Sequence, residues 1–226
     1  ELSAELSRPI QNIIRKYASY SMQYSLDTFP EKIQQYIDTC YLHMQSEIDR
    51  VQQEENDCKS PLLKTVDLPR LLNDSIVRPA VDFMFTVFTQ VLAEIRDKIK
   101  RYDSLYHLII RKAFHFAAKF KNAEYHSKFS NELHSFYALN NSKDINLIAF
   151  AETQYVRYET AVELNIFDTC YYALSDASKI ITKNVPVTLH EKICKAKYEL
   201  LKKNGYKFYA AILHNKLLEL YMANKN

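Results

Sequence analysis

The sequence predicts an all-α fold, and three observations support this prediction. The chain has a single glycine, Gly205, among 226 residues, whereas a chain of average composition and this length would carry about sixteen. The tight turns of β-sandwiches and barrels depend on Asn-Gly and Asp-Gly pairs, which one glycine cannot supply in number. Apolar residues recur instead at every third or fourth position along most of the chain. The shortage of glycine also excludes the P-loop and the dinucleotide-binding fingerprint.

Bulk composition leaves the function class open. The formal net charge of +3 is too small to indicate nucleic acid by itself. The most apolar stretch, residues 83–93, is shorter than the roughly 20 residues that span a bilayer, so we expect a buried helix and no membrane partner. The chain begins with Glu1 and has no signal peptide pattern, which suggests a segment of a longer protein. Four widely separated cysteines form no zinc or disulfide pattern and fit a reducing, cytoplasmic location: Cys40, Cys58, Cys170 and Cys194.

The first elements are a helix over residues 8–22 and a longer helix that starts near residue 28. Asp27 or Thr28 is the expected N-cap of the second helix, with Pro30 in its first turn. One apolar stripe follows this helix for nearly 25 residues, and seven acidic residues predict a solvated outer face. The stripe consists of Ile33, Ile37, Cys40, Met44, Ile48 and Val51. Residues 56–73 contain two prolines and are expected to form a loop.

The next two helices are expected over residues 74–100, with Pro79 in the first turn, and over residues 101–120. The apolar residues of the second one occupy about half of a helical wheel. A helix packed between two neighbours, as in a solenoid, has such a wide apolar face. These residues are Leu105, Tyr106, Ile109, Ile110, Ala113, Phe114, Phe116, Ala117 and Phe120.

Five more helices complete the prediction, and their short connections favour antiparallel neighbours. They cover residues 123–139, 144–164, 167–182, 186–203 and 206–223. Asparagine reaches the left-handed conformation at modest cost, so we expect it to cap these helices in place of glycine. The asparagines at the joints are Asn122, Asn140, Asn141, Asn165, Asn184 and Asn204. A rhythm of about 40 residues per helix pair predicts a right-handed, TPR-like solenoid, although the tetratricopeptide consensus is absent.

No catalytic, metal or cofactor site is predicted. None of the seven histidines has a histidine four residues away, and an HExxH motif is missing. His126 and His134 could project from similar sides of a helix, but two lone histidines make a poor metal site. One glycine cannot form a Gly-x-Ser-x-Gly motif. Glu159 and Glu163 lie one turn apart, which is routine on exposed helix faces. We therefore expect a protein that is not an enzyme.

The charges are distributed in alternating blocks. Residues 96–128 are strongly basic, residues 144–176 are acidic, and residues 190–226 are basic again. Opposite the apolar half of the 101–120 helix lies a row that we call the basic ridge. It consists of Arg101, Arg111, Lys112, His115 and Lys119. Such a ridge could contact RNA phosphates. A solubilising face that complements acidic neighbours is the alternative.

The C-terminal helix is apolar around nearly its whole circumference. Such a helix should be covered on most sides, so we expect a segment beyond Asn226, or a partner, to cover it. The candidate partner-facing residues are Ile212, Leu213, Leu217, Leu220 and Tyr221.

The order of residues in this helical region resembles a known family. Residues 105–137 read LYHLIIRKAFHFAAKFKNAEYHSKFSNELHSFY. The a subunit of eukaryotic translation initiation factor 3 is similar in its Leu-Tyr-His start, its Ala-Phe-x-Phe core and a later Leu-x-x-Leu-His-type helix. Residues 152–181 and residues 204–221 fit the same family, with Gly205 at the entrance of the last helix. The similarity extends in order over residues 25–222.

Other parts support or depart from this resemblance. Residues 25–48 fit the long helix that precedes these blocks, whereas residues 52–70 and 140–143 do not align. In the family, the helical array leads into a winged-helix module, and the two together form the PCI domain. The resemblance therefore implies a leading helix in residues 1–24 and a helical-repeat domain in residues 25–226 that stops before the winged helix.

The resemblance implies a scaffold function in translation initiation. The family joins the c and b subunits of the factor and assembles on the small (40S) ribosomal subunit. Expected contacts are ribosomal RNA and ribosomal proteins, with mRNA near its exit as a further one. On this basis the basic ridge becomes a candidate ribosome contact. The alternative is a helical segment of a proteasome-lid or COP9-signalosome PCI subunit.

Overall fold

The computed structural model describes residues 28–57, 77–96, 99–139, 146–180 and 186–223, together with Asn12 and Lys16. All regular structure within these residues is helical, which confirms the all-α prediction. The chain divides into two compact units, Glu1–Tyr102 and Asp103–Asn226, each described here by itself. The predicted helix over residues 8–22, the boundary after residue 24 and most of the predicted 56–73 loop lie outside the described residues.

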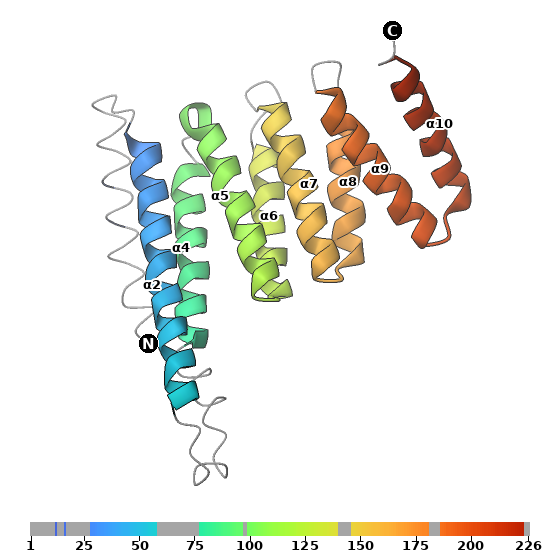
Figure 1. Cartoon of the computed structure of the whole chain (residues 1–226). Helices are drawn as coiled ribbons and strands as arrows, with labels where there is room; N and C mark the ends of the chain where they lie inside the picture. Colours follow the sequence, from blue (N-terminus) through green and yellow to red (C-terminus); the bar gives the residue numbers. More distant parts are fainter. Residues whose placement is uncertain are drawn as a thin grey trace. The chain divides into compact units, whose positions relative to one another are not determined.

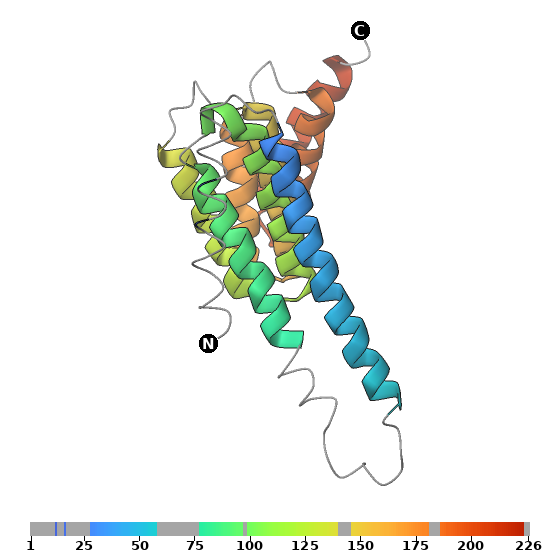
Figure 2. The same cartoon turned by 90° about the vertical axis from the view of Figure 1, so that its left-hand side faces the viewer.

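The first unit contains α2 (Phe29–Asp57) and α4 (Arg78–Arg96), which pack side by side (Figures 1 and 2). The backbone carbonyl of Thr28 accepts a hydrogen bond from the Lys32 N–H at 3.0 Å, so α2 starts where the sequence predicts. The apolar stripe of α2 is buried at Ile33, Ile37 and Met44. Its spacing of three or four residues keeps the stripe on the side that packs against α4.

Helix α4 is the most apolar described helix of the first unit, and ten of its side chains are buried. They are Val81, Met84, Phe85, Val87, Phe88, Gln90, Val91, Leu92, Glu94 and Ile95. The prediction of a buried helix over residues 83–93 is therefore confirmed. None of the described helices combines the length and the apolar character that a bilayer crossing requires.

Helix α5 (Ile99–Lys119) starts two residues before the predicted boundary. It is kinked at Tyr102, whose φ of −122° and ψ of 25° are not helical. The division between the two units falls at this kink. Within the first unit, the Tyr102 ring packs against Phe29, with ring centroids 4.8 Å apart.

The second unit continues with five helices whose bounds lie close to those predicted from the sequence. They are α6 (Ala123–Leu139), α7 (Leu147–Glu163), α8 (Phe167–Ile180), α9 (Val187–Lys203) and α10 (Lys207–Ala223). Successive helices run in opposite directions (Figure 1). Three of the connections span only three residues each, so α5 and α6, α7 and α8, and α9 and α10 form helical hairpins.

The three hairpins share one joint. At the first, the Asn122 N–H donates to the carbonyl of Ala117 at 2.9 Å; at the second, the Ile166 N–H donates to that of Ala161 at 2.9 Å. The third joint has the equivalent bond from Tyr206 to Leu201 at 2.9 Å. A bond across five residues with a left-handed residue before its donor is the Schellman motif, which satisfies carbonyls at the helix end.

The prediction that asparagine takes the left-handed conformation at these joints is correct at one joint only. Of the described asparagines, only Asn165 adopts this conformation, with φ of 58°. Lys121 (φ 50°) and Gly205 (φ 80°) do so at the other two joints. Asn122 instead caps the next helix, because its side-chain oxygen accepts from the Tyr125 N–H at 3.0 Å. Asn140, Asn141 and Asn184 lie outside the described residues.

The second helix of each hairpin buries its residues at the same distances, along the sequence, from the left-handed residue of the joint. The residues five, eight and twelve positions later are buried in all three hairpins, except that Leu213 is half-buried. They are His126, Phe129 and Leu133 in α6, Cys170, Ala173 and Ala177 in α8, and Ala210, Leu213 and Leu217 in α10. The common joint therefore sets a common register of burial.

Candidate functional site

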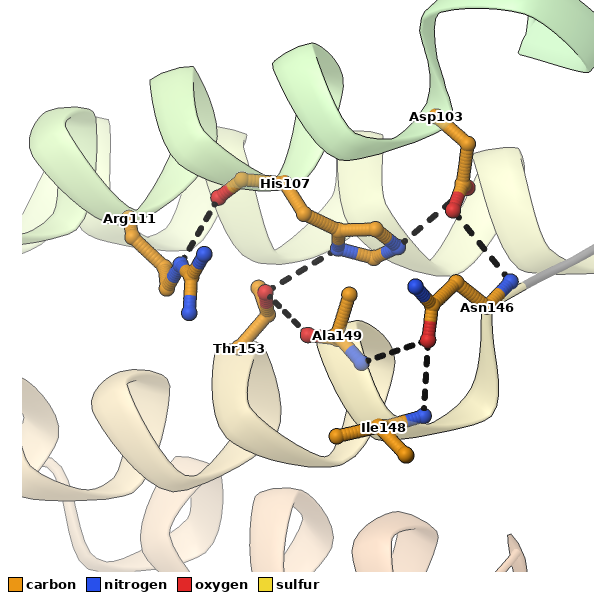
Figure 3. Close-up of polar contacts among 7 residues, drawn as sticks. All are labelled: Asp103, His107, Arg111, Asn146, Ile148, Ala149 and Thr153. Atoms are coloured by element: carbon orange, nitrogen blue, oxygen red, sulfur yellow. Dashed lines mark hydrogen bonds and ion pairs between the residues drawn. The ribbon is translucent and has the colours of Figure 1, made fainter.

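A buried polar contact joins α5 to α7 (Figure 3). The His107 side chain is fully buried, and its Nδ1 lies 3.0 Å from the Thr153 hydroxyl oxygen. Thr153 donates its hydroxyl proton to the carbonyl of Ala149 at 2.8 Å. The hydroxyl oxygen must then accept from His107, so the histidine is neutral with its proton on Nδ1. Burial, and secondly the charge of Arg111, lower the His107 pKa to about 3.

The other side of His107 faces a carboxylate. Its Nε2 lies 3.6 Å from Asp103 Oδ1, too far for a hydrogen bond, and neither atom has a hydrogen-bond partner. Asp103 Oδ2 accepts from the backbone N–H of Asn146 at 3.2 Å, and burial raises the Asp103 pKa. Asn146 in turn caps α7, because its side-chain oxygen accepts from two N–H groups of the first turn. These contacts position α7 on α5.

A second buried histidine is held in the same way between α6 and α7. Nε2 of His126 lies 3.0 Å from the hydroxyl of Thr160, which donates to the carbonyl of Val156 at 2.8 Å. Burial, and secondly the charge of Arg157, lower the His126 pKa to about 4. Both histidines are therefore neutral donors to threonines, and this contact satisfies one nitrogen of each buried ring.

A third buried polar residue, Arg157, lies on the same side of α7 as Thr153 and Thr160. We call the buried residues Thr153, Gln154, Arg157 and Thr160 the polar layer of α7. The Arg157 Nε donates to the Ser130 hydroxyl at 3.1 Å and its Nη1 to the Gln154 side chain at 3.2 Å. Nη1 also lies 3.9 Å from a carboxylate oxygen of Asp176. Sequence reasoning missed this layer because its residues are polar. A signal was present, since Thr153, Arg157 and Thr160 follow one another after four and three residues, the spacing that marks a core stripe.

The predicted basic ridge is divided in the structure. Arg111 is partly buried, its Nη1 lies 2.6 Å from Glu152 Oε2, and its Nε donates to the carbonyl of His107 at 3.1 Å. Its guanidinium is thus engaged with α7 and α5. Lys112 is half-exposed, while His115 and Lys119 are exposed on α5. Arg101 belongs to α5, but its side chain lies outside the described residues.

Chemically active clusters are sparse. In the described part of the chain, no three His, Cys, Asp or Glu side chains come together in a group that could hold a metal ion. Burial raises the pKa of the thiols of Cys40, Cys170 and Cys194, so each of them favours the unreactive thiol form. Glu159 and Glu163 are exposed on α7.

A concave surface of the second unit is a groove formed by α8, α9 and α10, with a volume of about 590 Å³. We call it the aromatic groove. Leu200 and Leu201, each 8% exposed, are its most buried lining residues, whereas Tyr172 and Tyr209 are about 60% exposed. Its lining residues are Phe167, Asp168, Tyr171, Tyr172, Lys197, Leu200, Leu201, Asn204, Tyr206, Tyr209, Ile212 and Leu213.

The joints that precede α8 and α10 position the first turns of these helices at the groove. Helices α8 and α10 both begin directly after a joint, so their first turns lie beside the last turn of α9. Gly205 makes the α9/α10 joint possible through its φ of 80°, a conformation that costs glycine little. A Cβ at this position would meet no atom within 4 Å, so the backbone conformation, and not space, favours glycine here.

The predicted partner-facing residues of α10 are separated by the structure. Ile212 and Leu213 line the aromatic groove. Leu217 is only 6% exposed and packs inside the chain, which corrects its expected place on a partner-facing surface, because this side of α10 lies against α9. The side chains of Leu220 and Tyr221 lie outside the described residues. The all-round apolar pattern of α10 thus combines a buried side with an exposed one.

Sequence reasoning missed the α8 half of the groove. Phe167, Tyr171 and Tyr172 are all exposed by 46% or more. No local signal separates this exposed pair from buried ones, because adjacent apolar residues such as Ile109 and Ile110 of α5 are both fully buried.

Comparison of the sequence with models of protein families finds no match, and a comparison with curated proteins finds none either.

Proposed function

We propose that this chain is a non-catalytic scaffold segment of the a subunit of eukaryotic translation initiation factor 3. It contributes to initiation-complex assembly on the small ribosomal subunit and binds other subunits of the factor. Its second unit is a right-handed helical-repeat array, of the TPR-like and PCI type. The three hairpins with one joint and one register of burial support this architecture. The family resemblance described above supports the system in which it works.

One observation carries the binding function: the last hairpin exposes its aromatic groove. Soluble proteins rarely expose contiguous apolar surface unless it serves an interaction. Tyrosine is also enriched at the centre of protein interfaces, because it combines a large contact area with a hydrogen-bonding group. The groove offers four exposed tyrosines, Tyr171, Tyr172, Tyr206 and Tyr209, together with the exposed Ile212. We therefore place the binding of the c or b subunit at this groove.

A non-catalytic function agrees with the use of the buried polar groups. Thr153 and Thr160 accept hydrogen bonds from His107 and His126, and Arg157 donates to Ser130 and Gln154. These groups hold helices together, so they are not available to a substrate. For the ribosome, we keep Lys112, His115 and Lys119 as the candidate contacts, since they are half-exposed or exposed on α5, whereas Arg111 is partly buried and pairs with Glu152.

The test measures binding of the full chain to purified c and b subunits. A groove variant carries Tyr209→Ser and Ile212→Ser; a matched control carries Phe208→Ser and Met222→Ser, two residues of α10 that are more exposed but do not line the groove. We expect subunit binding to weaken at least about tenfold in the groove variant only, as for interface hot spots. Equal binding of both variants, or binding to proteasome-lid subunits instead, would contradict the proposal.

The ribosome contact has its own measurement. Lys112→Glu combined with Lys119→Glu should weaken binding to small ribosomal subunits and reduce its dependence on salt, since phosphate contacts release counterions. Lys195→Glu, an exposed change on α9, is the control. Identical salt series for the three proteins would remove these lysines as ribosome contacts.

A further inference from the structure

The charges around the aromatic groove bear on the chemistry of its occupant. This inference rests on the proposed function, which places a protein partner in the groove. Lys197 lines the groove together with a single acidic residue, Asp168. Lys202 and Lys203 are exposed in the last turn of α9, and Lys207 is the exposed first residue of α10. Lys197 lines a site that contains one carboxylate, Lys203 contacts its lining residue Phe167, and Lys207 directly follows its lining residue Tyr206.

Three of these lysines contact aromatic rings or a hydroxyl group, and not carboxylates. Lys203 Nζ lies 5.9 Å from the ring centroid of Phe167, and Lys202 Nζ lies 5.5 Å from that of Tyr198. Lys197 Nζ donates to the Ser178 hydroxyl at 3.5 Å. Within the described residues, no ion pair joins any of the three to an acidic side chain. A cation on an aromatic face keeps most of its charge available, so an incoming carboxylate gains a partner without breaking an ion pair.

The lining between the lysines is apolar. Leu200 and Leu201 are nearly covered, and Leu213 is half-buried beside Ile212. An aliphatic lining favours aliphatic or aromatic side chains that insert into it, and buried apolar anchors supply most of the affinity of such contacts. Flat base stacking needs open ring faces, whereas Tyr171 and Tyr172 meet edge to face at an interplanar angle of 73°. These features favour a peptide over a single-stranded nucleic acid.

We propose that the aromatic groove binds an acidic peptide segment of a partner protein. Apolar side chains of the segment insert against Leu200, Leu201 and Leu213, and its carboxylates pair with Lys203, Lys207 and Lys197. The lysines guide the approach and set the preference for acidic sequences, while the apolar anchors hold the complex.

The experiment is a selection of random 16-residue peptides displayed on phage against the full chain. Peptides that also bind the Tyr209→Ser, Ile212→Ser variant are removed by counter-selection. We expect the enriched peptides to combine Asp or Glu with Leu, Ile, Phe or Trp. A synthetic peptide of the winning sequence is then measured by fluorescence anisotropy over a range of NaCl concentrations. We expect Lys203→Glu to weaken its binding about tenfold at low salt and less at high salt.

Matched controls separate charge from general damage. Lys195→Glu makes the same charge change on α9 outside the groove, and Met222→Ser removes an exposed apolar side chain of α10 outside it. Both should bind the peptide within about twofold of the unmodified chain, as remote surface changes do. Circular dichroism verifies that every variant remains helical.

Each outcome decides a different claim. Enriched peptides that depend on the groove but are neutral or basic would overturn the acidic preference and leave the proposed protein-binding function standing. An absence of groove-dependent peptides would overturn both. A single-stranded oligouridine probe that displaces the selected peptide, and binds more tightly than it, would overturn the peptide assignment in favour of RNA.

Discussion

The first and the last hairpin of the second unit have the same joint but differ in how much of their second helix is buried. In the first, the position nine residues after the left-handed residue is Ser130, which is 5% exposed and accepts a bond from Arg157 of α7. In the last, the equivalent residue is His214, which is exposed. The α5/α6 hairpin is covered by α7, whereas no described helix covers the groove side of α10. One architecture therefore produces a core where another helix covers the hairpin and an exposed surface where no described helix does.

The largest expected difference between the two regions concerns aromatic residues. Phe136 is fully buried and stacks on Tyr106, with ring centroids 4.0 Å apart. We expect Phe136→Ala to lower the free energy of unfolding by about 3–5 kcal/mol. Tyr209→Ala in the groove should change it by less than about 0.5 kcal/mol. Urea unfolding followed by circular dichroism measures both, and similar losses would show that the groove belongs to the core.

The buried histidines predict a pH dependence that the groove does not share. The pKa values of His107 and His126 fall to about 3 and 4, so both stay neutral in the folded chain while the unfolded chain takes up protons below pH 6.5. Stability is then fully present above pH 6.5 and decreases as the pH falls, by about 1.4 kcal/mol per pH unit for each histidine. The raised Asp103 pKa acts in the opposite direction at lower pH.

Denaturant unfolding between pH 7 and pH 5 measures this slope. His126→Asn should make it shallower by about one histidine, or ~1.4 kcal/mol per pH unit. A slope that stays the same in this variant would contradict the assignment of a neutral, buried His126.

A smaller change tests the contact between α5 and α7. Thr153→Val removes the acceptor of the His107 Nδ1 proton and keeps the shape of the side chain. A buried donor without a partner costs about 1–3 kcal/mol, and we expect this loss in the free energy of unfolding. Thr188→Val, at an exposed position of α9, is the control and should cost less than about 0.5 kcal/mol. Equal effects would mean that the histidine does not depend on Thr153.

The smallest expected effects compare the joints themselves. Lys121 adopts a φ of 50°, which glycine reaches without the cost that a Cβ adds. Lys121→Gly should therefore stabilise the chain by up to about 1 kcal/mol, and Gly205→Ala should destabilise it by a similar amount. Thermal unfolding measures both shifts. Shifts of the same sign at the two joints would contradict their equivalence.

The sequence was sufficient to predict the described helices because their apolar spacing is local. The bounds of α6 agree with the prediction at both ends, and α9 and α10 differ from it by one residue at the start. The position of the left-handed residue was predicted wrongly at two joints. Joint geometry decides whether an asparagine acts as the left-handed residue, like Asn165, or as the N-cap of the next helix, like Asn122.

Long-range pairing could not be predicted. His107 and Thr153 are 46 positions apart, and Arg111 and Glu152 are 41 apart, so nothing in their local sequence indicates the contact. The same limit applies to the groove, because Tyr171 and Tyr209 share it only through the way α8 and α10 pack around α9. Leu213 and Leu217 are one turn apart in sequence, yet only Leu213 lines the groove.

The shared joint has a consequence for the modularity of the chain. Lys121 and Asn165 occupy the same place in their joints, 44 positions apart in the sequence. Deleting residues 121–164 would connect α5 directly to α8 through a complete joint and leave α9, α10 and their groove unchanged in sequence. Inserting a copy of the same segment would add one helix pair and one more joint of the same kind. The matching joints therefore give the segment that holds α6 and α7 the ends of one complete unit, which can be removed or repeated without changing the sequence of any joint.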